Sequence, residues 1–225
     1  MTETKPTIAI IGGTGKEGPG LAARWASAGY QIIIGSRQAE KAQAIAADLN
    51  MKLGTHNIQG MENSEAVQRA QICVLTVVQS AHQEAVVSLK DALKGKILVD
   101  ATARVDFRDP KPPAPPSAAR LAQDLLGPDV RVVAAFQNIP AHILKKNIGE
   151  SLGADVLVCA DDSQAAIEVI RLAEAGGMHA FHTGGLDNAI VVEGLTAILL
   201  SLNKAYGIKT ASISVTGIPD MMRDS

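Results

Sequence analysis

The sequence predicts an α/β fold in which a doubly wound, mainly parallel sheet is followed by a small helical C-terminal part. Short apolar runs alternate with helical patterns along most of the chain. Hydrophobic residues make up 47% of the 225 residues and aromatic residues only 3%, so Ala, Val, Ile and Leu must build the core, as in parallel strands covered by helices. A glycine-rich turn follows the first apolar run, which is typical of the Rossmann type of this fold.

That turn lies between an apolar run at 7–11 and a helical pattern. Gly13, Gly15 and Gly18 fit the spacing G-x-G-x-x-G. We expect Gly13 to let the chain turn sharply out of the strand, Gly15 to let a pyrophosphate approach the backbone, and Gly18 to let the helix pack close to the sheet. The predicted dinucleotide-binding residues here are Gly13, Thr14, Gly15, Lys16, Glu17 and Gly18. The alternative is a glycine-rich turn with no ligand.

The residues after the second predicted strand indicate which dinucleotide binds. An NAD site usually has an acidic residue here for the ribose 2′-hydroxyl. This chain has Ser36 and Arg37, with Lys41 about one helical turn later. A hydroxyl, a guanidinium and an ammonium group would hold a 2′-phosphate, so the sequence predicts NADP as the cofactor. The alternative is that both cations merely solvate a helix start, where they would oppose the helix dipole.

The remaining elements follow from hydrophobic periodicity and from helix start and stop residues. The first helix begins near Pro19 and ends at Gly29, and Asn63 or Ser64 is expected to cap the third helix. Predicted strands lie at 31–35, 72–78, 97–99, 130–136, 155–160 and 178–182, with weaker ones at 52–59 and 212–215, and predicted helices at 39–49, 62–69, 118–126, 164–175 and 188–206.

Ligands of such sheets lie at the carboxyl ends of the strands. That rule nominates Val78, Gln79, His82 and Thr102, and also the loop Gln137–His142, which contains Asn138, Ile139 and Ala141. A surface histidine at a helix start is the alternative for His82. The segment 109–116 is proline-rich and should be extended, either as a stiff surface loop or as a flap over the substrate.

Several function classes are disfavoured. The net charge of −2 argues against a sequence-independent grip on nucleic acid. The N-terminus lacks a signal-peptide pattern and no uncharged apolar run reaches membrane-spanning length, so we expect a cytoplasmic protein without a membrane partner. Both cysteines, Cys73 and Cys159, lie in apolar runs and are expected to be buried thiols. Asp161 and Asp162 are expected to cap a helix, and no metal site is expected.

The helix predicted at 188–206 is apolar nearly all round, with Leu195, Ile198 and Leu199 among its large aliphatic residues. Its own sheet can cover only one side, so a second copy of the chain is the expected cover, with Leu199 at the contact. We therefore expect a homodimer, and a division into an NADP-binding Rossmann domain at 1–185 and a small helical dimerisation part at 186–225.

With these residues in view, the chain resembles the F420:NADP oxidoreductases, which are NADPH-dependent reductases of the deazaflavin coenzyme F420. The resemblance rests on short motifs distributed along nearly the whole chain. They are Gly12–Gly15 with Gly18, Gly35–Arg37 with Lys41, Phe136–Ala141, Asp161–Asp162, the long helix with Glu193, and Ser214–Thr216. It implies that Thr14, Ser36, Arg37 and Lys41 hold NADP. It also implies that Gln137–Ala141 lies beside the nicotinamide and the deazaflavin ring, and that the enzyme is a homodimer.

The activity implied is direct hydride transfer between nicotinamide C4 and the deazaflavin carbon that replaces flavin N5. The protein must stack the two rings and exclude water, and no side-chain nucleophile is required, so no catalytic residue is named. This chain has Val78-Gln79 where the family usually has Pro-Trp, and Gln137 where it often has His. These departures keep two alternatives open: an NADP-dependent reductase of a flavin or a small carbonyl compound, with His82 or His142 as proton donor, and a non-catalytic NADP-sensing protein.

Overall fold

One eight-stranded sheet runs through the molecule, with the strand order β3-β2-β1-β4-β5-β6-β7-β8. The computed structural model describes residues 5–218. The strands are β1 (Ile8–Ile11), β2 (Ile32–Ser36), β3 (Ile58–Glu62), β4 (Ile72–Leu75), β5 (Ile97–Asp100), β6 (Arg131–Ala134), β7 (Asp155–Ala160) and β8 (His179–His182). Strands β1 to β6 are parallel, β7 is antiparallel to β6, and β8 is parallel to β7. The predicted doubly wound, mainly parallel sheet is confirmed.

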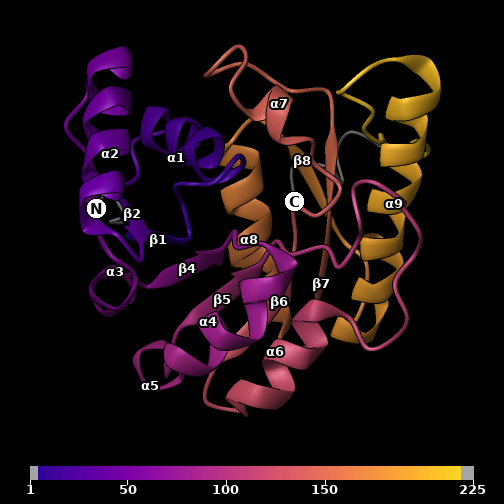
Figure 1. Cartoon of the computed structure of the whole chain (residues 1–225), viewed down its shortest axis with the longest axis horizontal. Helices are drawn as coiled ribbons and strands as arrows, with labels where there is room; N and C mark the ends of the chain where they lie inside the picture. The colour runs from indigo at the N-terminus through magenta and orange to yellow at the C-terminus, as the bar shows by residue number, and fades with distance from the viewer. Residues whose placement is uncertain (1–4, 219–225) are drawn as a thin grey trace.

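Helices cover both faces of this sheet (Figure 1). They are α1 (Gly18–Ser27), α2 (Ala39–Leu53), α3 (Asn63–Arg69), α4 (His82–Ser88), α5 (Lys90–Leu93), α6 (Ala118–Leu126), α7 (Ala141–Leu144), α8 (Ser163–Ala175) and α9 (Ala189–Tyr206). Alternation along β1 sends Ile8 and Ile10 into the core under α1, α2 and α8, and Ala9 and Ile11 into the core under α3, α4 and α6. The sheet is thus buried on both faces, as its aliphatic strands require.

The order of the strands switches between β1 and β4: β2 and β3 lie on one side of β1, and β4 begins the series on its other side. Ligands of open parallel sheets bind at this switch point, outside the carboxyl ends of the strands. The first glycine-rich turn follows β1 and therefore lies at that point. The fold places the predicted cofactor residues after β1, β2, β4 and β6 along one edge of the sheet.

Three details of the predicted elements are wrong. The weak strand expected at 52–59 is divided between the end of α2, which Gly54 terminates at φ +64°, and β3, which begins at Ile58. The cap of α3 is the Glu62 carboxylate, which accepts a hydrogen bond from the Ser64 amide, because Asn63 is already the first helical residue. Residues 212–215 form no strand, although the Asp155 amide donates to the Ile213 carbonyl.

The long C-terminal helix is present as α9, at the edge of the molecule opposite α2 (Figure 1). It buries Val192, Glu193 and Leu199 against its own chain and leaves Val191 and Ile198 exposed, Ile198 by 53%. The expectation that Leu199 lies on the outer face is therefore wrong, since only 6% of it is exposed. The segment Leu186–Tyr206 is long and apolar enough to cross a membrane by length and composition alone, a test that core helices also pass.

Candidate functional site

The glycine-rich turn after β1 is built for close backbone packing. Gly12 has φ +67°, so Gly12, rather than Gly13 as expected, makes the left-handed bend out of the strand. Gly13 is required for space, because a Cβ there would lie 2.7 Å from the Ile10 carbonyl oxygen. A Cβ at Gly18 would lie 2.5 Å from the Gly13 Cα, which confirms that Gly18 lets α1 approach the turn. Asn63 fixes the bend by accepting a hydrogen bond from the Gly12 amide at 3.2 Å.

Gly15 differs from its neighbours. A Cβ there would meet the Gly12 and Thr76 carbonyl oxygens at 3.5 and 3.8 Å, which are ordinary contacts, and its φ is not left-handed. The protein itself therefore does not require glycine at this exposed position. Room for a ligand at the backbone is the remaining reason for it, and this fits a pyrophosphate at the start of α1.

The end of β2 presents the predicted phosphate-reading residues. Ser36 is buried, and its hydroxyl accepts a hydrogen bond from the Gln38 amide at 3.1 Å. Arg37 and Lys41 are exposed, and neither side chain has a hydrogen bond or ion pair within residues 5–218. Ser36 pairs in register with Glu62, whose carboxylate is occupied by the cap of α3. Two free cations at a strand end fit a phosphate better than a ribose diol.

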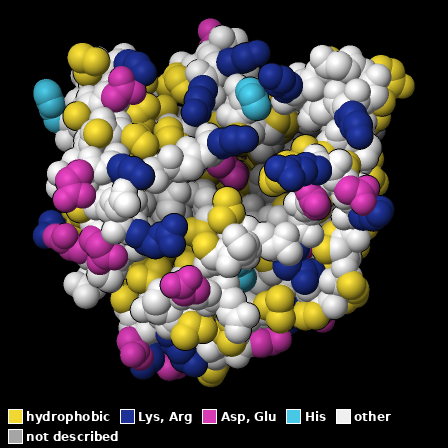
Figure 2. Space-filling view, in the orientation of Figure 1, with side chains coloured by type: hydrophobic (Ala, Val, Ile, Leu, Met, Phe, Trp, Pro, Cys, Tyr) yellow, Lys and Arg dark blue, Asp and Glu magenta, His cyan; other side chains and the backbone are white. Residues whose placement is uncertain are grey.

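Figure 2 shows that the face of the molecule seen there is hollowed, and that Lys and Arg side chains gather around the hollow. Such a ring of positive charge over a concave surface attracts anionic ligands such as dinucleotide phosphates. Within residues 5–218, no three His, Cys, Asp or Glu side chains are grouped so as to hold a metal ion.

The loop after β4 contains Val78 and Gln79, both exposed, with Val78 at 69%. Gln79 opens a short 3-10 helix that leads into α4. The exposed aliphatic side chain of Val78 can therefore pack against the ring of a planar ligand. The assignment of Val78 and Gln79 as cofactor-binding residues stays a prediction. The assignments of Thr14 and Lys16 stay predictions as well.

The loop after β6 is strained and tightly held. Phe136 is fully buried with φ +74°, a conformation that is unfavourable for a bulky residue and is typical of functional loops, and its ring meets Trp25 edge to face at 5.8 Å. The Asn138 side chain is buried and donates to the Asp155 carbonyl at 2.7 Å, so it holds the start of β7. Ile139 is buried in the core, and Ala141 opens α7. If Asn138 and Ile139 contact a cofactor, they do so through the backbone.

Buried Arg24 of α1 anchors the segment that comes after this loop. Its guanidinium donates to a set of backbone carbonyls, those of Leu144, Lys146, Asn147, Glu150 and Gly176. These bonds fix α7 and the following turn against α1. The loop beside the site therefore has a rigid attachment that the sequence alone did not indicate, because the acceptors are backbone groups.

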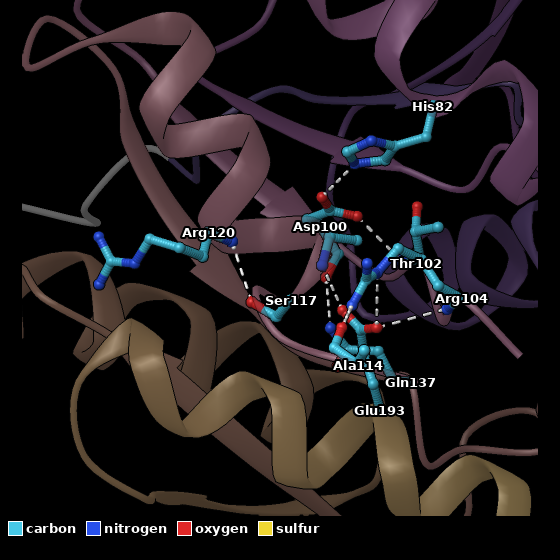
Figure 3. Close-up of polar contacts among 10 residues, drawn as sticks. His82, Asp100, Thr102, Arg104, Ala114, Ser117, Arg120, Gln137 and Glu193 are labelled. Carbon is cyan, nitrogen blue, oxygen red and sulfur yellow. Dashed lines mark hydrogen bonds and ion pairs between the residues drawn. The ribbon is translucent and has the colours of Figure 1, made fainter. Parts of the chain in front are cut away.

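A buried polar cluster lies at the ends of β4, β5 and β6 (Figure 3). His82 Nε2 lies 2.6 Å from Asp100 Oδ2, and Asp100 Oδ1 accepts a hydrogen bond from the Thr102 amide at 2.9 Å. The Gln137 amide group donates to the Asp100 carbonyl at 2.8 Å. All four side chains are buried. Three strands, far apart in sequence, thus contribute to one cluster, and His82 is not the surface histidine of the alternative interpretation.

Glu193 of α9 lies near enough to this cluster for its charge to act on His82, and its own bonds run toward the proline-rich segment. Its carboxylate accepts hydrogen bonds from the Ala118 amide and, at 3.2 Å, from Arg104 Nε, and Arg104 donates further to the Ala114 carbonyl at 2.7 Å. The proline-rich segment is therefore held against α9. It lies so close to this helix that a Cβ at Gly194 would be 3.6 Å from the Pro112 Cβ. The sequence alone assigns no role to Glu193. The only local indication that it is functional or structural is that it is a lone acid inside an apolar helix.

Two titratable groups at the site are perturbed. Burial raises the pKa of Glu17 to about 8, and the buried Oε1 of its carboxylate has no hydrogen-bond partner among residues 5–218. For His82, burial opposes the charged form, but the hydrogen bond and charge of Asp100 outweigh it and raise the pKa. The site thus combines an acid held neutral beside the glycine turn with a histidine that favours its charged form.

The sequence of this chain is similar to those of known NADP reductases. Residues 7–104 match the family model described as NADP oxidoreductase, coenzyme F420-dependent. The chain is 38% identical to the F420-dependent NADP reductase of Methanothermobacter marburgensis, covering 95% of this chain and 99% of that one. It is 35% identical to the F420-dependent NADP reductase of Methanocaldococcus jannaschii, over 94% and 98% of the two chains.

The fold is shared with a solved structure. A crystal structure from Arthrobacter, provisionally described as an F420-dependent NADP reductase, superposes with a TM-score of 0.80 over 95% of this chain and 100% of that one. Its sequence identity is 22%, so this comparison supports the arrangement of sheet and helices and carries no further argument.

Proposed function

The chain belongs to the family of F420-dependent NADP reductases, and from this we propose that it transfers a hydride between NADP(H) and the deazaflavin coenzyme F420. The observation that carries the proposal is the pairing of an open Gly15 with the free cations Arg37 and Lys41 at the neighbouring strand end. The first admits a pyrophosphate and the second holds a 2′-phosphate. Together they select NADP from the dinucleotides.

The nicotinamide and the deazaflavin supply the redox chemistry, and the protein supplies binding, orientation and exclusion of water. The backbone amides at the start of α1 would hold the pyrophosphate, and the nicotinamide would lie toward the ends of β4 and β6. The strained loop at Phe136–Ile139 and the α7 helix after it would then border the nicotinamide. Direct transfer needs the reacting carbons about 3–3.5 Å apart, and the hydrogen bonds from Arg24 to the segment after this loop favour a rigid position.

The test is NADPH oxidation by the purified protein with F420, with FMN, and with no acceptor. We expect rapid F420-dependent oxidation and little or none in the other two reactions. Equal rates with FMN would favour a general flavin reductase, in line with Val78-Gln79 at the acceptor side of the site. Tight NADP binding with no turnover on any acceptor would indicate an NADP-sensing protein instead.

We further propose that the protein is a cytoplasmic homodimer, with a Rossmann domain at 1–185 and a dimerisation part at 186–225. Support comes from α9, whose outward residues Val191, Ile198, Leu202 and Tyr206 form an apolar stripe that its own chain leaves exposed. Stripes of this kind are rarely left in water, and pairing with the same stripe of a second copy would cover them.

Light scattering at micromolar concentration tests this assembly. We expect twice the mass of one chain for the wild-type protein and the mass of one chain for Ile198→Glu, because the charge would be buried at the contact. Ile198 is the suitable position, since Leu199 is packed within its own chain. A wild-type protein with the mass of a single chain would contradict the proposal.

A further inference from the structure

The proposed function as argued above assigns no role to the His82–Asp100 pair, although it is the most completely buried ion pair of the site. His82 is 5% exposed and Asp100 is 0% exposed. Both residues lie at the carboxyl ends of β4 and β5, on the edge of the sheet at which ligands of such folds bind. Asp100 holds one ring nitrogen, Nε2, at 2.6 Å. This fixes the ring and leaves the other nitrogen, Nδ1, for a different partner.

Two further atoms of the same cluster lack partners. Within residues 5–218, Thr102 Oγ1 and Gln137 Oε1 are buried and have no hydrogen-bond partner. Leaving a buried polar atom unpaired costs about 1–3 kcal/mol, so such atoms require an explanation. Thr102 lies just past the end of β5 and Gln137 just past the end of β6, and the Gln137 side-chain nitrogen donates to the Asp100 carbonyl. A hydroxyl and an amide oxygen match the C=O and N–H groups of a heterocyclic amide.

Resting on the proposed function, we propose that His82, Thr102 and Gln137 receive the pyrimidine end of the deazaflavin, and that His82 donates the proton that completes its reduction. In that reaction the C4–H bond of NADPH breaks and its hydride forms a C–H bond at the deazaflavin carbon that replaces N5. The electron pair displaced through the ring reaches the pyrimidine nitrogen N1, which takes the proton from His82. NADPH, a proton and F420 are thereby converted to NADP and reduced F420.

The charges around His82 support its role as an acid. Asp100 of β5 and Glu193 of α9 favour the imidazolium, while Arg104 opposes it. Burial also opposes it, and the net effect is a raised pKa. A raised pKa favours the charged form of the His82 ring, which is the form that can donate a proton in the direction of F420 reduction. In the reverse direction the neutral ring accepts the proton.

The first experiment measures kcat/KM for F420 reduction by NADPH from pH 6 to pH 9. Wild-type kcat/KM should fall as pH rises through the pKa of His82. His82→Gln keeps a donor to Asp100 but carries no transferable proton, so its kcat/KM should be at least about 10-fold lower at pH 6.5 and should lose that pH dependence. His56→Gln, an exposed histidine between α2 and β3, is the matched control and should retain the wild-type profile.

The second experiment needs no turnover. The His82 imidazole is titrated by NMR in the ligand-free protein, where its pKa should exceed the ordinary value of about 6.5 and fall in Asp100→Asn. That variant also serves if His82→Gln does not fold. Dissociation constants for NADP should be unchanged in His82→Gln and in Gln137→Met, whereas KM for F420 should rise in Gln137→Met.

Each outcome decides the matter. If the wild-type protein reduces F420 and His82→Gln keeps the wild-type pH profile, the inference is wrong and the proposed function stands. If Gln137→Met weakens NADP binding and leaves KM for F420 unchanged, these atoms serve the nicotinamide carboxamide, and the inference is likewise overturned. If the wild-type protein oxidises no NADPH with F420 at any pH, the proposed function fails, and this inference fails with it.

Discussion

The two halves of the cofactor edge are built by different means. After β1 and β2 the site consists of backbone, glycine and exposed cations that bond to little else in the chain. After β4, β5 and β6 it contains a cluster of buried polar side chains joined by hydrogen bonds. The contrast is sharpest in two buried carboxylates: Glu17 has an oxygen without a partner, while Glu193 is bonded by Arg104 and Ala118. The first half therefore serves ligand binding, whereas the second half also stabilises the fold.

The largest effect is expected from two glycines of the same turn. Gly15→Val should weaken NADP binding by at least about 100-fold, because its side chain occupies the approach of the pyrophosphate, while the fold survives. Gly18→Val should instead unfold the turn, since a Cβ there would lie 2.5 Å from Gly13. Fluorescence titration and thermal melting distinguish the two variants. A folded Gly15→Val protein that binds NADP tightly would show that the open backbone is not the phosphate site.

In the second half, Glu193→Ala should lower the free energy of unfolding by about 3–5 kcal/mol, because it leaves Arg104 without its buried partner. Urea denaturation measures this loss. Glu193→Gln is the control: it keeps an acceptor for the Ala118 amide and should lose less. If Glu193→Ala unfolds at the wild-type urea concentration, the buried cluster does not stabilise the fold and the contrast between the halves disappears.

Arg37→Ala should act oppositely, on binding and not on folding. The affinity for NADP should fall by about 1.5–3 kcal/mol, the usual contribution of a charged hydrogen bond, while NAD binding and stability stay unchanged. Lys52→Ala at the far end of α2, which removes an exposed cation paired with Asp48, is the matched control. Equal losses for NADP and NAD in Arg37→Ala would mean that this residue does not contact the 2′-phosphate.

The effect expected at Glu17 is a pH dependence of stability. Folding raises its pKa from 4.5 to about 8, so the folded state binds its proton more tightly than the unfolded state. The free energy of unfolding should therefore decrease by up to about 1.4 kcal/mol per pH unit between those values, through this group alone. Glu17→Gln should remove that dependence and be the more stable protein at pH 8. Parallel urea midpoints for both proteins from pH 5 to pH 8 would contradict a strained, unpaired Glu17.

The same contrast explains which parts of the site the sequence could predict. The first half lies within short stretches, Gly12–Gly18 and Ser36–Lys41, so its spacing and residue types are legible in the chain. The second half joins His82 to Asp100 and Glu193 to Ala118 across long separations, which no local pattern encodes.

Other features of the site depend on tertiary packing. The place of Asn138 after a strand predicts a cofactor contact, which stays a prediction, and only the packed chain shows that its side chain donates to the first residue of β7. A helix that is apolar all round does not show from its sequence which side faces the core. The sequence therefore predicts Leu199 on the outer face of α9, and only the packed chain shows that it lies on the inner face. The bend at Gly12 instead of Gly13 depends on a φ angle that a run of two glycines leaves undetermined.

The central claim is that this cofactor edge brings nicotinamide and deazaflavin into contact for direct hydride transfer. NADPH labelled with deuterium at both nicotinamide C4 positions tests it in a single turnover with F420 in ordinary water. The account predicts that the reduced F420 carries deuterium at the carbon that replaces flavin N5, with none released to the solvent. Hydrogen from water at that carbon, or NADPH oxidation that leaves F420 unreduced, would contradict it.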